Sequence, residues 1–268
     1  MRFLLSFFLL YTFGSQVQAK LIKSETLLAK ILENYQYIYQ FYAEATVTVY
    51  DSEAFHLLNE EGTGNNISYV LTDRAYTQNV IFMRDEYLLI ETKDLAGTLL
   101  HLYIKEGGKV FNMNIDKDRK FHTEDVIYPY AVFFTKFISV LKTGLSELGI
   151  TLLDVRLKRY DNRYVYQLGT EEENVKVSQD DFRVLEANRT IRIRGEIHHL
   201  KTTFQKWDQA KKRIPRLLRY YIDNRLLKEV WLTKVNIRGN RARESDFIKK
   251  YRHYLSPSLF TATINYAR

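Results

Sequence analysis

The stretch FYAEATVTVY, residues 41–50, alternates apolar and polar side chains and decides the fold class. Its apolar side chains fall on one side of an extended chain: Ala43, Ala45, Val47 and Val49. This period of two is typical of a strand with one buried and one solvated face. Residues 25–41 instead place apolar side chains at three-and-four spacing after Ser24, which predicts a capped amphipathic helix. We therefore expect a helix that leads directly into a sheet.

Strand-like runs continue on both sides of a second helical segment, residues 128–148, whose apolar stripe is wide and rich in Phe. Short segments with turn-forming residues separate the runs, a spacing typical of an antiparallel meander and not of βαβ units. The predicted class is α+β, with a long curved antiparallel sheet and the second helix on its concave face. Residues 20–268 contain no linker-like segment and are expected to form a single domain. The expected strands cover residues 42–50, 67–73, 78–84, 87–92, 98–105, 109–114, 151–158, 163–169, 182–187, 190–195, 197–205, 217–223 and 227–237.

The first 19 residues have the features of a cleavable signal peptide. Arg2 precedes an apolar run of about 11 residues, which is shorter than the roughly 18–20 residues needed to span a bilayer. Val17 and Ala19 supply small residues at the positions that signal peptidase reads, so cleavage is expected after Ala19; the alternative is an uncleaved anchor. The sequence contains no cysteine, which excludes a lipoprotein-type signal and disulfide bonds. We expect an exported protein that is stabilised by its core alone.

Motifs that carry catalytic or metal chemistry are missing from the sequence. It has no GxSxG elbow, no phosphate-binding glycine loop and no HExxH motif, and its six histidines are scattered. The acidic runs at 171–173 and 179–181 are interpreted as solvated loops, with a calcium site as the alternative. The sequence therefore predicts a protein that is not an enzyme, with no catalytic residue, no metal and no cofactor.

The chain is basic, with a formal net charge of +8. For an exported protein this charge favours an anionic membrane surface or an acidic envelope protein as partner, and no nucleic acid is expected. Two short segments carry a candidate basic surface, for which a solvated face is the more frequent explanation: Arg192, Arg194, Lys211, Lys212 and Arg213.

Aromatic residues make up 14 % of the chain, with 20 Tyr, 16 Phe and 2 Trp, most of them in the expected strands and the second helix. Such a load fits an ordinary core, and it equally fits a curved sheet that encloses a cavity for acyl chains. Periodicity leaves both interpretations open.

Three parts of the chain resemble the periplasmic outer-membrane lipoprotein carrier (LolA-like, lipoprotein-sorting) superfamily. The helix at 28–32 with the strand at 41–50 looks like the family's opening, and residues 82–90 through 109–114 resemble its early strands with a glycine-marked turn. Residues 204–217, 226–237 and 244–247 are similar to its C-terminal half, which a proline-led strand begins and an Asp-Phe pair closes. The resemblance covers about residues 27–251.

The resemblance implies an open half-barrel of antiparallel strands, closed by helices on its concave face, that shields acyl chains during lipoprotein sorting in the periplasm. In the family an arginine on an early strand ties the lid shut; the strand at 42–51 has none, and Arg74 and Arg84 are the candidates for that role. The implied protein is a monomeric carrier whose partner is a lipid or lipoprotein acyl chain. The alternative is an envelope protein-interaction or sensor module on the same scaffold. The expected apolar groove is lined by Val47, Phe82, Tyr87, Leu89, Phe133, Phe137 and Trp231.

Overall fold

The computed structural model describes residues 22–52, 54, 75–84, 87–106, 109–114, 133, 135–207 and 214–238. These residues form two helices and one antiparallel sheet. In chain order the elements are α2 (Ser24–Tyr35), β1 (Gln40–Val49), β2 (Ala75–Met83), β3 (Tyr87–Lys93), β4 (Leu99–Glu106), β5 (Lys109–Asn114), α5 (Ile138–Glu147), β6 (Val155–Tyr160), β7 (Arg163–Gly169), β8 (Asn174–Ser178), β9 (Val184–Ile193), β10 (Glu196–Trp207), β11 (Pro215–Ile222) and β12 (Arg225–Arg238).

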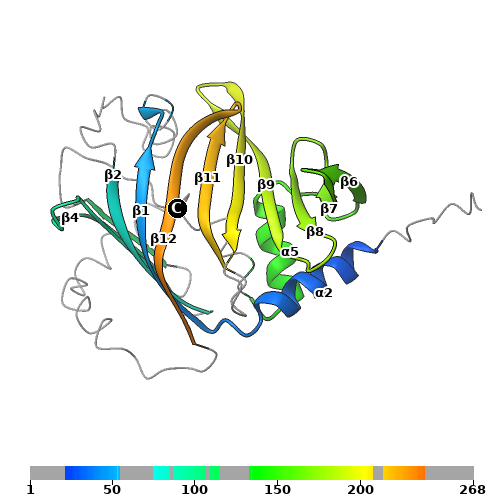
Figure 1. Cartoon of the computed structure of the whole chain (residues 1–268), viewed down its shortest axis with the longest axis horizontal. Coiled ribbons are helices and arrows are strands. Elements are labelled where there is room, and N and C mark those ends of the chain that lie inside the picture. Colours follow the sequence, from blue (N-terminus) through cyan, green and yellow to red (C-terminus); the bar gives the residue numbers. More distant parts are fainter. Residues whose placement is uncertain are drawn as a thin grey trace, which may run out of the picture.

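The sheet has twelve strands in the order β5-β4-β3-β2-β1-β12-β11-β10-β9-β8-β7-β6. Two meanders, β1 to β5 and β6 to β12, are joined where the first strand pairs with the last, and Figure 1 shows β1 and β12 side by side at the middle of the curved sheet. The edge strands β5 and β6 lie at opposite ends of the strand order, so the sheet is open and is not a closed barrel. The predicted fold class is confirmed.

Both helices are shorter than the periodicity predicted. Helix α2 ends at Tyr35, because residues 36–39 form a turn and Phe41 already belongs to β1. Helix α5 begins only at Ile138; the backbone N–H of Phe137 before it donates to Thr135 Oγ1 at 3.1 Å. It ends at Glu147, and Gly149 shortly after it has a φ of +81°, which suits the left-handed position after a helix. Part of the predicted span, 128–132, lies outside the described residues, as does the expected strand at 67–73.

One face of the sheet, called here the helix-covered face, holds the main core. Burial alternates along β1, so that Phe41, Ala43, Ala45, Val47 and Val49 are all at most 3 % exposed. The helices pack onto this face through Leu27, Leu28, Ile31 and Tyr35 of α2 and Leu141 and Leu145 of α5, all fully buried. Each fully buried large aliphatic side chain contributes about 1.5–3 kcal/mol to folding. Removal of apolar surface from water therefore holds both helices on the sheet.

The end of the sheet from β6 to β9 curls toward the opposite face, called here the outer face. Glu186 of β9 accepts hydrogen bonds from Tyr160 Oη on β6 at 2.8 Å and from Lys176 Nζ on β8 at 2.6 Å. Asn188 Nδ2 donates to the same carboxylate at 2.8 Å. Strands β7 and β8 separate β6 from β9, so Tyr160 reaches Glu186 only because the sheet bends. The carboxylate is 4 % exposed and has its charge compensated inside the curl.

The Glu186 contacts predict a pH-dependent contribution to stability. Burial raises the pKa of Glu186, but the hydrogen bonds from Lys176 and Asn188 outweigh it and hold this pKa below the usual 4.5. A carboxyl whose pKa is lowered by folding stabilises the protein above its unfolded pKa, and this stabilisation is lost as the pH falls through the folded pKa. Replacement by glutamine, E186Q, is expected to lower the free energy of unfolding by about 1–3 kcal/mol at pH 7.

Urea unfolding of the wild type and of E186Q at pH 7 and pH 3.5 measures this effect. The difference between the two proteins should be largest at pH 7 and should shrink at pH 3.5. The matched control is Glu171→Gln, since Glu171 is exposed and its loss should change stability little. An E186Q deficit of the same size at both pH values would contradict the assignment.

Candidate functional site

Three of the seven predicted groove residues lie together on the helix-covered face. Val47 is fully buried on β1 and pairs in register with Tyr76 of β2 and Val230 of β12. Phe82 of β2 packs against the same core, and Phe133 is fully buried with its ring 6.2 Å from that of Tyr35 at the end of α2. All three side chains thus belong to the core of the helix-covered face, and Phe133 is the one that contacts α2.

Of the other four predicted residues, three lie elsewhere and the fourth cannot be placed on a face. Leu89 is 3 % exposed but points to the outer face, since its neighbours Leu88 and Ile90 pack into the core of the helix-covered face. Trp231 also lies on the outer face and is 41 % exposed, whereas Phe137, just before α5, is 58 % exposed. Tyr87 begins β3, and its side chain lies outside the described part of the chain. The structure therefore does not bring Leu89, Phe137 and Trp231 to one surface with Val47.

The helix-covered face is filled by side chains from the helices, with Leu28 and Ile31 of α2 fully buried against it. A cavity of about 480 Å³ lies between α2 and the β8–β9 connection. Its lining is mostly polar: Lys30, Glu33, Asn34, Tyr37, Asp180, Asp181 and Phe182. Where Leu28 and Ile31 cover the described part of this face, an apolar chain can reach it only if α2 moves.

Arg84 fixes the C-terminal end of α2 to the sheet. This side chain follows β2 directly, is 2 % exposed, and sends Nη2 to the carbonyl oxygens of Gln36 at 2.6 Å, Tyr35 at 3.3 Å and Ile38. Its backbone N–H donates to the carbonyl oxygen of Tyr39 at 2.9 Å. The last carbonyls of a helix lack intrahelical partners and carry partial negative charge. Because α2 has no basic residue in its own last turn, Arg84 supplies the compensating charge.

Of the two arginines that the family resemblance suggested as the tie, Arg84 is the one that the structure describes; Arg74 lies outside the described residues. The opposite end of α2 is held differently. Lys142 Nζ on α5 donates to Glu25 Oε1 at 2.9 Å, and the two side chains are 36 % and 75 % exposed. An ion pair so open to water adds little stability. The polar contacts of α2 are thus strong at its C-terminal end and weak at its N-terminal end, where the fully buried Leu27 and Leu28 provide the attachment.

Sequence reasoning missed a row of polar side chains on the helix-covered face. Gln78, Thr92 and His101 stand opposite one another on β2, β3 and β4, and each is at most 2 % exposed. The sequence could have revealed this row. Gln78 is two residues from both Tyr76 and Val80, so in a strand its side chain must point to the same face as theirs. A second buried polar group on this face is Lys228 of β12, 1 % exposed, with its ammonium 4.7 Å from the centroid of the Tyr220 ring.

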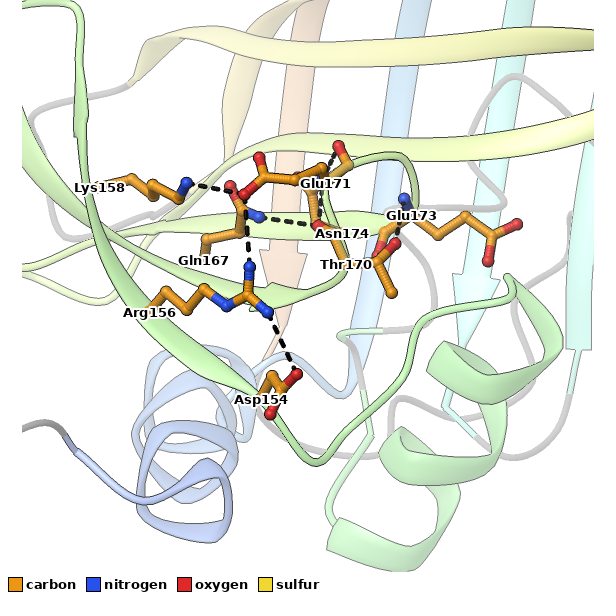
Figure 2. Close-up of polar contacts among 8 residues, drawn as sticks. All are labelled: Asp154, Arg156, Lys158, Gln167, Thr170, Glu171, Glu173 and Asn174. Carbon is orange, nitrogen blue, oxygen red and sulfur yellow. Dashed lines mark hydrogen bonds and ion pairs between the residues drawn. The ribbon is translucent and has the colours of Figure 1, made fainter.

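The first acidic run forms the β7–β8 turn (Figure 2). Lys158 Nζ lies 2.7 Å from Glu171 Oε1, and the Arg156 guanidinium lies 3.4 Å from the same atom. The hydrogen bond from Lys158 is the main cause of the lowered pKa of Glu171. Asn174 Nδ2 donates to the carbonyl oxygens of Thr170 and Glu171, at 3.1 and 2.9 Å, and so closes the turn. These contacts give the run a structural role between two strands of the curled end.

The candidate basic surface is described only in part. Arg192 belongs to β9, whereas Arg194, predicted to lie in a strand, occupies the β9–β10 turn with a φ of +51°. Both side chains are exposed, and Arg192 Nη1 donates to the carbonyl oxygen of Gly195 at 3.1 Å. Lys211, Lys212 and Arg213 lie outside the described residues.

Two chemical possibilities were searched within the described ranges. No three His, Cys, Asp or Glu side chains there gather closely enough to hold a metal ion. Among the same residues, no helix has the length and apolar character needed to cross a membrane.

Comparisons with known proteins give matches only among solved structures. No protein-family model matches the sequence, and no curated protein matches it significantly. A LolA superfamily protein from Nitrosomonas europaea is similar over 84 % of this chain and 99 % of its own, with a TM-score of 0.49 and 10 % identity. A domain described as outer membrane lipoprotein-sorting, from Vibrio parahaemolyticus, is similar over 85 % and 98 %, with a TM-score of 0.46 and 10 % identity. A DUF1329 family protein from Desulfovibrio piger is similar over 88 % and 98 %, with a TM-score of 0.40 and 12 % identity.

Proposed function

We propose that this protein binds the acyl chain of a lipid or lipoprotein between α2 and the helix-covered face of its sheet, and carries it through the periplasm without chemical conversion. The observation that carries the proposal is the unequal attachment of α2. Arg84 holds its C-terminal end by three carbonyl contacts, whereas its N-terminal end is held by the apolar contacts of Leu27 and Leu28 and by one exposed ion pair. Such a helix can swing away from the sheet about its bound end.

The apolar part of the helix-covered face suits an acyl chain. Ala43, Ala45, Val47 and Val49 form a continuous apolar strip on β1, and Val230 and Leu232 extend it onto β12. Each buried methylene group contributes about 0.8 kcal/mol to binding, so a chain that replaces the inner side chains of α2 can offset their removal from the core. No catalytic group is needed for this exchange.

Native mass spectrometry of protein extracted from its own envelope without detergent tests the proposal. The expected result is an added mass that fragments to a lipid or an acylated peptide. Val47→Phe, which fills the space above β1, should lower the lipid-bound fraction, while the matched control Trp231→Phe on the outer face should leave it unchanged. Bound lipid lost equally from both variants would place the site elsewhere.

A bare polypeptide mass from the wild type would contradict the carrier proposal. It would favour the alternative, an envelope protein-interaction module on the same scaffold. In that case crosslinking in the envelope, with charge reversal at Arg192 and Arg194, is the experiment that identifies a partner protein or an anionic membrane surface.

A further inference from the structure

The row of Gln78, Thr92 and His101 crosses the apolar surface assigned above to the acyl chain. Gln78 lies between Tyr76 and Val80 on the helix-covered side of β2, and its register partner on β1 is Ala45. Of this pair of side chains, Ala45 is small, so the amide of Gln78 projects further from the sheet. An acyl chain lying along β1 would therefore pass beside this amide.

The amide of Gln78 is only half satisfied. Its Nε2 donates to Thr92 Oγ1 at 3.1 Å, whereas its Oε1 is fully buried and has no hydrogen-bond partner. Buried polar atoms nearly always have a partner, because an unpaired acceptor loses its hydrogen bonds to water without replacement. An acceptor kept in this state within an apolar face suits a ligand that brings the missing donor.

We infer that Gln78 Oε1 accepts a hydrogen bond from an N–H or O–H group of the bound ligand. This inference rests on the proposed acyl-binding function and narrows its ligand class to acyl chains that carry a hydrogen-bond donor. Two kinds of ligand can supply this hydrogen-bond donor: an N-acylated peptide through its amide N–H, and a hydroxylated lipid through its hydroxyl group. A chain that ends in an ester lacks the donor.

Three probes of equal chain length test the inference on the full protein: hexadecanamide, hexadecan-1-ol and methyl hexadecanoate. Titration calorimetry of the wild type should show that at least one donor probe binds about tenfold more tightly than the ester. Preference for the amide identifies the N-acylated source, and preference for the alcohol identifies the hydroxylated source. Q78L should abolish the preference and raise the midpoint of thermal unfolding, because it removes an unpaired acceptor from an apolar region.

The matched control is Q167L. Gln167 is also 2 % exposed, but its Nε2 donates to the carbonyl oxygen of Thr170 at 2.7 Å, far from β1 in the strand order. This variant should lower the unfolding midpoint and keep the probe preference. Equal binding of all three probes, or a preference that survives in Q78L, would overturn the inference and leave the carrier proposal standing. Failure of every probe to bind would instead refute the carrier proposal.

Discussion

Replacing Arg84 with methionine is expected to lower the free energy of unfolding by about 3–5 kcal/mol. Methionine keeps much of the apolar stem but removes the guanidinium that binds the carbonyl oxygens of Tyr35, Gln36 and Ile38. Those carbonyls then remain at the end of α2 without their charged partner. The loss should appear first as local opening of α2, and faster uptake of a fluorescent acyl probe should accompany it.

Hydrogen exchange followed by mass spectrometry separates local from global opening. In Arg84→Met, peptides from residues 24–35 should exchange faster than in the wild type by a larger factor than peptides from residues 184–222. The control is Arg192→Met, since Arg192 is exposed at a strand end and its replacement should change stability by less than about 0.5 kcal/mol. Equal acceleration of exchange in both regions would show that Arg84 stabilises the whole fold and not α2 in particular.

Replacing Phe133 with alanine is expected to cost about 3–5 kcal/mol, because it removes a fully buried ring and leaves a cavity beneath α2. If the helix-covered face accepts an acyl chain, the chain can also fill this cavity. Hexadecan-1-ol should then raise the thermal midpoint of Phe133→Ala more than that of the wild type. Differential scanning fluorimetry at several probe concentrations measures both values.

The control for this second variant is Leu217→Ala. Leu217 is 1 % exposed, but it faces the outer side of the sheet beside Trp231. Its removal should also lower stability, by about 2–5 kcal/mol, without increasing the response to the probe. A larger probe response in Leu217→Ala than in Phe133→Ala would place the acyl-binding surface on the outer face.

Local patterns predicted the elements better than their ends. The alternation in residues 41–50 predicted β1, and the three-and-four spacing after Ser24 predicted α2. The same spacing overran the helix, because Ile38 and Phe41 are core residues that lie in a turn and in a strand. The spacing of apolar residues shows which side chains are buried. Buried residues continue past the end of the helix, so the spacing does not mark where the helix ends. Strand β8 was missed because it is a short segment between two acidic runs.

The groove residues were harder to predict, because each prediction required knowing on which face of the sheet the side chain lies. Leu88, Leu89 and Ile90 form an apolar run, as do Val230, Trp231 and Leu232, so neither run shows an alternation that marks the core side. In both places the sheet buries apolar side chains of the run on one face and turns the central residue to the other. Val47, which lies in a strand with clear alternation, was placed on the core side with its neighbours.

The sequence by itself determined the antiparallel class, the order of helix and meander, and the apolar strip of β1, because each depends on residues close together in the chain. Only the tertiary structure decided that β1 pairs with β12, that Arg84 binds the end of α2, and that Gln78 lies in an apolar face with an unpaired oxygen. These contacts join residues from different elements. Their energy depends on the mutual geometry and shared desolvation of those elements, which periodicity within one segment does not encode.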